Sequence, residues 1–133
     1  MSRTIVIGDV HGCYREWVEL LRVLEVKPED RLISVGDLIC KGPDSRAVME
    51  SAMALPNLEC ILGNHEDRFL GYWKEGVKEF LKPYDKGVME QLKPEFERYM
   101  KFISKWKLYA ELDDIVVVHA GVRNGIPLDK QTL

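Results

Sequence analysis

The sequence predicts an α/β domain in which parallel strands alternate with helices. Two observations support this prediction. Short apolar runs alternate with segments whose apolar residues recur at helical spacing. Each of the first three apolar runs also ends in a turn rich in glycine or polar residues, as buried strands do. At 133 residues the chain is long enough for one domain, 1–133, with a hydrophobic core.

The first half of the chain accounts for the predicted parallel sheet. The apolar runs predict three buried strands: Thr4–Ile7, Arg31–Val35 and Leu58–Leu62. Tyr14–Leu24 has apolar residues at helical spacing and predicts the first helix. A second helix should begin after the loop 41–43, with Asp44 or Ser45 as its N-cap, and run to about Ala54.

Residues 67–106 interrupt this alternation. They contain helical patterns separated by glycine and proline, together with all four phenylalanines. We expect a helical insert whose aromatic residues form a core rather than platforms for stacking bases, and whose lysines form a solvated face. After the insert, 108–112 and 115–119 predict a β-hairpin.

Composition excludes several classes of partner. Hydrophobic residues make up 46% and charged residues 31%, as in an ordinary soluble globular protein. The net charge of −3 gives no argument for nucleic acid or an anionic membrane as partner. No apolar run is long enough to span a bilayer, and the start lacks the apolar region of a signal peptide. Three cysteines without a Cys-x-x-Cys pair indicate reduced thiols, so we expect a cytoplasmic protein.

Polar side chains follow four of the predicted strands at the point where each strand ends. They are Asp9, His11, Asp37, Asn64, His65 and His119. Because strand ends at one edge of a sheet bring distant residues together, we expect these side chains to converge. Carboxylate, amide and imidazole donors are ligands for a divalent metal.

Each segment alone also has a simpler interpretation. Asp9 and Asp37 could cap loops or helices, His119 could be a structural histidine, and Glu66 could favour the first turn of a helix. Four such segments in one chain favour the metal site.

The spacing also suggests a role for each residue. Asp9 and His11 lie two residues apart, so an extended backbone puts them on one side, within reach of one metal. Asp37 could bridge two metals, and Asn64 and His119 could complete the second position. His65 would point elsewhere and protonate the leaving oxygen.

Four motifs resemble, in order, those of the PPP-type metallophosphoesterases, which include serine/threonine protein phosphatases and symmetrical diadenosine tetraphosphate hydrolases. They are Gly8-Asp9-Val10-His11-Gly12, Gly36-Asp37-Leu38-Ile39-Cys40-Lys41-Gly42-Pro43, Gly63-Asn64-His65-Glu66 and His119-Ala120-Gly121. The resemblance implies a metallophosphoesterase-like βαβ sheet sandwich and two divalent metal ions, with manganese favoured over iron, zinc, cobalt or nickel.

The same resemblance implies the site. Asp9, His11 and Asp37 would bind the first metal, and Asp37, Asn64 and His119 the second. Lys41 and Asn64 would bind phosphate, and His65 would be the general acid.

Two departures from the family pattern matter. Protein phosphatases of this type usually have Asp-Arg where this chain has Cys40-Lys41. That aspartate orients the catalytic histidine, and that arginine holds phosphate; Lys41 keeps the charge without the bidentate fork. The family also supplies a further metal-binding histidine after the His-Ala-Gly motif, whereas no histidine follows His119 here. We therefore expect the C-terminal half of the domain to be missing, the isolated chain to be a poor enzyme, and its uncovered apolar surface to favour self-association.

The resemblance implies hydrolysis of a phosphoanhydride or phosphomonoester by metal-activated water. Residues around Cys13 and Lys41 look more like the diadenosine tetraphosphate branch, so a dinucleoside polyphosphate is the expected substrate. A phosphoprotein is the alternative within the same chemistry. A non-catalytic module that binds metal or phosphate, or serves as an interaction domain, is the alternative from another class.

Overall fold

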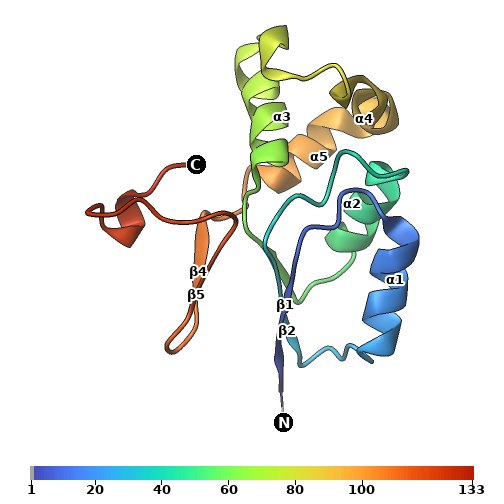
Figure 1. Cartoon of the computed structure of the whole chain (residues 1–133). Coiled ribbons are helices and arrows are strands. Elements are labelled where there is room, and N and C mark those ends of the chain that lie inside the picture. The colour runs from blue at the N-terminus through green and yellow to red at the C-terminus, as the bar shows by residue number, and fades with distance from the viewer. Residues whose placement is uncertain (1) are drawn as a thin grey trace.

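A three-stranded parallel sheet organises the N-terminal half of the chain (Figure 1). The computed structural model describes residues 2–133. Strands β1 (Thr4–Ile7), β2 (Arg31–Ser34) and β3 (Leu58–Cys60) lie in the order β1-β2-β3. Ile5 pairs with Leu32, and Ile33 pairs with Glu59. The predicted α/β class and its parallel strands are confirmed.

Two helices connect these strands and cover one face of the sheet (Figure 1). Helix α1 (Tyr14–Val23) buries Trp17, which packs with Val48 of α2 (Ser45–Met53). The Asp44 carboxylate accepts a hydrogen bond from the Ala47 amide at 2.9 Å and so caps α2, as predicted. These right-handed crossovers bring both helix N-termini to the carboxyl edge of the sheet.

The predicted insert is helical and has an aromatic core. It consists of α3 (Asn64–Glu75), α4 (Asp85–Leu92) and α5 (Phe96–Ile103), with 3₁₀ turns at Lys78–Phe80 and Lys93–Glu95. Phe69 and Tyr99 are fully buried in this core. Helix α3 begins at Asn64 rather than near residue 67, so Asn64 and His65 belong to its first turn.

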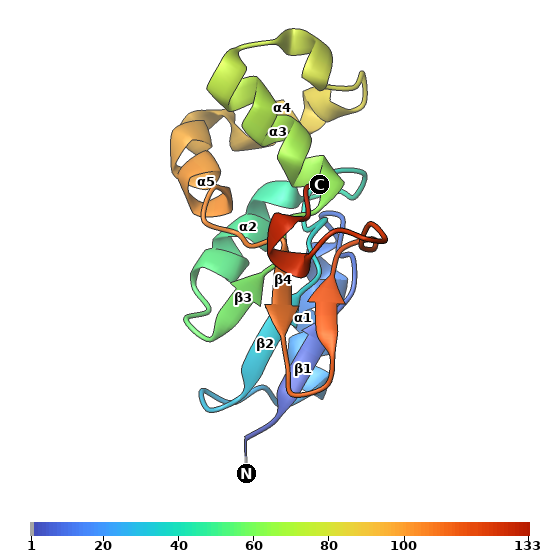
Figure 2. The ribbon, with the colours of Figure 1, turned by 90° about the vertical axis from the view of Figure 1, so that its left-hand side faces the viewer.

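A separate antiparallel hairpin covers the other face of the sheet (Figure 2). Strand β4 (Tyr109–Glu111) pairs with β5 (Val116–Val118), and a final 3₁₀ turn spans Leu128–Lys130. Ala110 and Val117 of the hairpin pack against Ile33 and Ile61. The expectation that all four strand ends share one sheet edge is therefore wrong in one respect, because β5 belongs to a second sheet. The hairpin still delivers His119 to the same place by packing across the face.

The described residues contain no helix that combines the length and the apolar character needed to cross a bilayer.

Candidate metal centre

Two loops form the floor of the site, one after β1 and one after β2. The Val10 and His11 amides donate to the Asp37 carbonyl at 3.0 and 2.8 Å. His11 and Asp37 both have left-handed backbone conformations, with φ of 49° and 53°. Such conformations cost energy in residues other than glycine and cluster at functional sites. The two loops therefore hold His11 and Asp37 in positions that a relaxed backbone would not favour.

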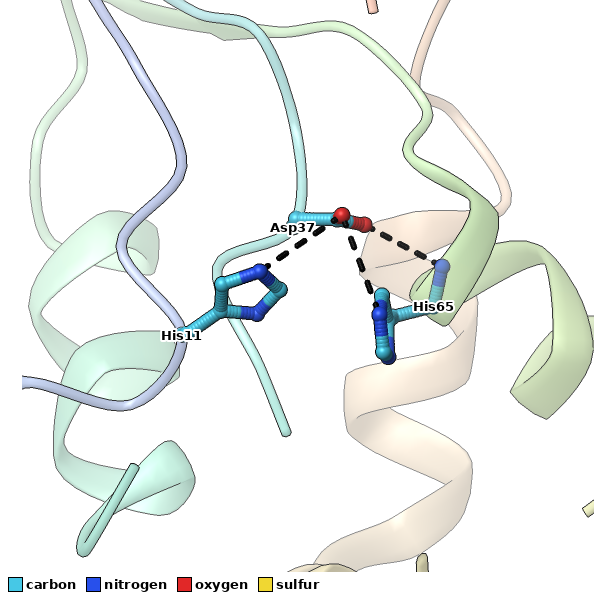
Figure 3. Close-up of side chains that lie close together, drawn as sticks. All are labelled: His11, Asp37 and His65. Carbon is cyan, nitrogen blue, oxygen red and sulfur yellow. Dashed lines mark hydrogen bonds and ion pairs between the residues drawn. The ribbon is translucent and has the colours of Figure 1, made fainter. Parts of the chain in front are cut away.

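Asp37 lies at the centre of the donor cluster, and its side chain is almost fully buried. Its Oδ1 accepts a hydrogen bond from the His65 amide at the N-terminus of α3, at 3.1 Å. Its Oδ2 faces three imidazoles, at 3.8 Å from His11 Nε2, 3.9 Å from His65 Nε2 and 3.2 Å from His119 Nε2. Figure 3 shows His11 and His65 on either side of this carboxylate. The Oδ1 atom is thus held by a backbone amide, and the Oδ2 atom is available to bind a cation.

Two of the histidines present a ring lone pair to this centre. His11 Nδ1 lies 3.1 Å from the Ile39 carbonyl, and His119 Nδ1 lies 2.8 Å from the Val35 carbonyl. A carbonyl oxygen only accepts, so each Nδ1 carries the hydrogen and each neutral ring keeps its lone pair on Nε2. This arrangement is typical of metal-binding histidines, whose second nitrogen is held by an outer hydrogen bond.

The inward-facing atoms of five residues are all acceptors, which suits a cation between them: Asp9, His11, Asp37, Asn64 and His119. His11 Nε2 lies 3.6 Å from Asp9 Oδ2, and His119 Nε2 lies 2.9 Å from Asn64 Oδ1. Donor atoms of Asp9, Asp37 and His119 lie within 4.8 Å of one another, as do those of His11, Asp37 and His65. Lone pairs that face lone pairs repel unless a proton or a cation lies between them. The donor set therefore fits divalent metal ions of the hard-to-borderline class.

Glu66 holds the loop after β2 from below. Its side chain is fully buried and accepts hydrogen bonds from the amides of Asp37 at 2.8 Å, Leu38 at 2.8 Å, Ile39 at 3.2 Å and Gly63 at 3.2 Å. Burial and, to a smaller extent, the Asp37 charge raise the pKa of Glu66 to about 7, although the hydrogen bonds from these amides oppose the rise. In the sequence, Glu66 looks only like a residue that favours the first turn of a helix, and nothing there indicates that it holds the Asp37 loop.

His65 has different contacts from the other two histidines. Its Nδ1 lies 3.1 Å from Arg68 Nη2, and Arg68 in turn pairs with Asp85 at 3.0 Å. Burial lowers the pKa of His65, and the positive charge of Arg68 lowers this pKa further. The negative charge of Asp37 opposes the shift. Sequence analysis missed Arg68 and Asp85. The spacing of His65 and Arg68, three residues apart on a helix, was the one available signal for Arg68.

Cys40 and Lys41 occupy the positions where the sequence departs from the Asp-Arg pattern. Both have left-handed backbones, with φ of 75° and 70°. Cys40 is buried beside Asp85, and burial raises the pKa of its thiol, so it remains a neutral packing residue. Lys41 is exposed, and its charge lies close enough to the site to lower the pKa of His65.

Comparison with known proteins gives consistent results. The model of a family described as calcineurin-like phosphoesterase matches residues 2–132. Two curated relatives named "Bis(5'-nucleosyl)-tetraphosphatase, symmetrical" come from Proteus mirabilis and Edwardsiella ictaluri. They are 36% and 33% identical to this chain over 124 and 123 residues. Each alignment covers 90% of this chain but 44% and 43% of the relative, so the chain spans less than half their length.

Solved structures share the fold. A crystal structure described as a candidate diadenosine tetraphosphatase matches with a TM-score of 0.75 and 25% identity, covering 99% of this chain and 60% of that one. A serine/threonine phosphatase from Saccharomyces cerevisiae matches with a TM-score of 0.66 and 21% identity, covering 92% of this chain and 42% of that one. At that identity the second match bears on the fold alone.

Proposed function

The chain belongs to the calcineurin-like phosphoesterase family, and from this premise we propose that it forms the metal-binding part of a hydrolase that cleaves a phosphoanhydride bond. The observation that carries the proposal is the convergence of Asp9, His11, Asp37 and His119 around one buried carboxylate oxygen. A site of this composition suits the binding of a phosphorylated substrate through divalent ions.

The proposed metal sites are two. Asp9, His11 and Asp37 would hold the first ion, and Asp37, Asn64 and His119 the second. Mn²⁺ is the proposed ion, with iron, zinc, cobalt and nickel as competitors for the same donors. A pair of such ions supplies Lewis acidity to a phosphoryl oxygen and lowers the pKa of water.

The remaining residues act on the substrate itself. Lys41, exposed at the rim, would attract and hold a phosphate oxygen, and Asn64 would contribute its exposed amide. His65, which is not held by a backbone carbonyl as His11 and His119 are, would present its Nε2 to the leaving oxygen. Asp37 would orient the site, because its Oδ1 is already fixed by the first turn of α3.

The proposed substrate is a dinucleoside polyphosphate. The names of the relatives from Proteus mirabilis and Edwardsiella ictaluri support it, and symmetrical cleavage would release two nucleoside diphosphates. The alternative substrate, a phosphoprotein, rests on the resemblance of the four sequence motifs to those of serine/threonine protein phosphatases. The alternative from another class is a module that binds metal or phosphate without turnover.

The deciding experiment is an assay of the chain with Mn²⁺ on diadenosine tetraphosphate, a phosphoserine peptide and an aryl phosphate. We expect slow turnover of diadenosine tetraphosphate to two ADP, in keeping with the poor activity expected of this chain by itself, and we expect chelator and Asp37→Asn to abolish it. Release of ATP and AMP would contradict symmetrical cleavage. A binding module would hold Mn²⁺ but turn over none of the three substrates.

Two further proposals concern the setting of the protein. Cys13, Cys40 and Cys60 are all unpaired, which supports a reducing, cytoplasmic location. Large apolar side chains are exposed towards the C-terminus, at Ile115, Val116, Val122, Ile126 and Leu133, which supports self-association. Sedimentation over a range of protein concentrations would detect it, and a monomer at the highest concentration would exclude it.

A further inference from the structure

His65 differs from the other two histidines in which ring nitrogen carries the hydrogen. An arginine side chain has only donors, so the Arg68 Nη2 group at 3.1 Å requires a lone pair on His65 Nδ1. The hydrogen of the neutral ring is then on Nε2, the nitrogen that faces Asp37 Oδ2 at 3.9 Å. His11 and His119 have the opposite arrangement, because carbonyl groups face their Nδ1 atoms. His65 therefore faces the centre as a hydrogen-bond donor, and the other two face it with lone pairs.

Arg68 is itself held rigidly by Asp85. Arg68 Nη2 lies 3.0 and 3.1 Å from the two Asp85 oxygens, and its Nε lies 3.3 Å from Oδ2. The Asp85 side chain is completely buried and also accepts from the Lys82 amide at 2.8 Å. The Arg68 guanidinium also lies over the Tyr84 ring, 5.6 Å from its centroid. A planar guanidinium with this many partners is pre-organised, so it can fix the ring it contacts.

Asp85 also reaches the position where the chain departs from the family pattern. The Cys40 Sγ atom lies 3.5 Å from Asp85 Oδ1, although the two residues are far apart in sequence. Cys40 stands where the resembling phosphatases have the aspartate that orients the catalytic histidine. The carboxylate next to position 40 thus comes from α4, whereas position 40 itself, on the loop after β2, has none.

We propose that Arg68, held by Asp85, is a positioning residue that fixes His65 with its hydrogen on Nε2, and that this pair replaces the missing carboxylate at position 40. The proposal deepens, and rests on, the proposed function, because it assigns His65 a specific part in hydrolysis. Arg68 and Asp85 do not touch the substrate; they act through the orientation and the hydrogen position of His65.

This arrangement has a consequence for the substrate. A neutral imidazole donates a hydrogen bond from Nε2, but transfer of that proton would leave an anionic ring. In hydrolysis, the water oxygen bonds to phosphorus and loses a proton to the solvent, and the bond to the leaving oxygen breaks with its electron pair on that oxygen. A nucleotide phosphate leaves readily as an anion, whereas a serine alkoxide needs a full proton. The site should therefore prefer leaving groups of low basicity, such as nucleotides and aryloxides, over alkyl phosphate esters.

The test combines nuclear magnetic resonance of the metal-free chain with kinetics. Nitrogen-15 spectra of the histidines distinguish ring nitrogens with and without a hydrogen. We expect His65 to carry its hydrogen on Nε2, and Arg68→Met and Asp85→Asn to give a mixture of tautomers. Arg68→Lys should retain part of the wild-type pattern because it keeps a donor. Arg98→Met is the matched control, since Arg98 pairs with Glu50 outside the site.

Kinetics with Mn²⁺ should follow the spectra. Arg68→Met should lower kcat on diadenosine tetraphosphate by roughly 10²-fold with little change in KM, while Arg98→Met leaves kcat unchanged. The wild-type chain should turn over an aryl phosphate and not a phosphoserine peptide.

Three results would overturn the proposal. One is a hydrogen on Nδ1 of His65 in the wild type, another is an unchanged tautomer in Arg68→Met, and the third is equal turnover of the phosphoserine peptide. A chain with the expected tautomers but no turnover of any substrate would leave the positioning pair intact and refute the proposed function instead.

Discussion

Asp37 joins three segments of the candidate site through hydrogen bonds. Its backbone carbonyl accepts hydrogen bonds from the Val10 and His11 amides in the loop after β1, and its own amide donates to Glu66. Its Oδ1 accepts a hydrogen bond from the His65 amide in the first turn of α3. Only Oδ2 is left to face the imidazoles. Because the backbone holds the other groups, a change at Oδ2 should alter ligand binding more than folding.

The substitution Asp37→Asn should weaken both proposed metal positions. The asparagine keeps an oxygen for the His65 amide but loses the negative charge and one oxygen donor. We expect Mn²⁺ affinity to fall by at least about 10-fold, which is the smallest loss typically seen when a residue that only supports a metal ligand is replaced. Calorimetric titration would measure this, with Asp114→Asn, an exposed hairpin residue, as the control. Unchanged affinity would show that Asp37 is not a ligand.

Among the elements, the loops after β1 and β2 pack directly against each other. A side chain at Gly42 would collide with the His11 carbonyl, because the loop after β2 presses directly on the loop after β1. Gly87, on the exposed side of α4, has open space around it. Gly42 is thus required for the close approach of the two loops, whereas Gly87 has room for a side chain.

Alanine at these two glycines should have opposite effects on the free energy of unfolding. Gly42→Ala should lower it by about 1–3 kcal/mol, the range for overpacking. Gly87→Ala should raise it by about 0.5–1 kcal/mol, because alanine loses less entropy in a helix. Urea unfolding of both variants would measure the two changes. A neutral Gly42→Ala would mean that the two loops do not pack as described.

An ion pair between Arg3 and Asp30 lies just before β1 and β2, and its contribution to stability should depend on pH. Arg3 holds Asp30 through Nε at 3.1 Å and Nη2 at 2.7 Å, and the Lys27 amide adds a third hydrogen bond at 2.8 Å. Chiefly through the Arg3 hydrogen bonds, the pKa of the Asp30 carboxyl lies well below its usual value. A lowered folded-state pKa contributes stability above the unfolded value of about 4, and that stability is lost as pH falls below it.

Asp30→Asn should therefore destabilise the chain at neutral pH, and the difference from wild type should shrink as the pH falls below about 4. Thermal unfolding of both proteins across this range would test the sign. Asp114→Asn again provides the control, with no pH-dependent difference expected. A difference that grows towards acid pH would contradict the assignment.

For the whole molecule, the candidate site is where three layers meet. Helices α1 and α2 cover one face of the parallel sheet, the β4–β5 hairpin covers the other, and α3 begins at its edge (Figures 1 and 2). The donors come from the loops after β1 and β2, the first turn of α3 and the segment after β5, and they repel one another when no cation is bound. Metal binding should therefore stabilise the relative positions of these segments.

We expect Mn²⁺ to raise the melting temperature of the chain. A site filled at 100 times its Kd adds about 2.7 kcal/mol. The second position should fill at higher concentration than the first, because its third ligand would be the neutral Asn64 amide, whereas the first position has the charged Asp9 carboxylate. A thermal titration with Mn²⁺, reversed by chelator, would measure both phases. The absence of any shift at millimolar Mn²⁺ would refute the metal assignment for this chain.

Local pattern was sufficient for the strands, the first two helices and the identity of the candidate donors. Apolar periodicity depends only on the residues that are close in sequence. Asp9, Asp37 and Asn64 each follow a predicted strand closely in the sequence, so the strand ends identify them as candidates. The same reasoning placed the hairpin before His119. It could not assign that hairpin to a second sheet, because sheet membership depends on hydrogen bonds between distant segments.

The contacts that depend on distant segments became visible only in the folded chain. In the sequence, Glu66 looks like an ordinary first-turn residue of a helix. Arg68 and Asp85 look like two more surface charges in a mixed-charge insert. Their roles depend on which segments pack above them: Glu66 lies under the loop after β2, and Asp85 is brought by α4 against Arg68 and Cys40. The sequence shows which charged residues exist, but tertiary packing decides which of them are buried and which groups they contact. Burial and these contacts determine where a proton or a metal ion binds.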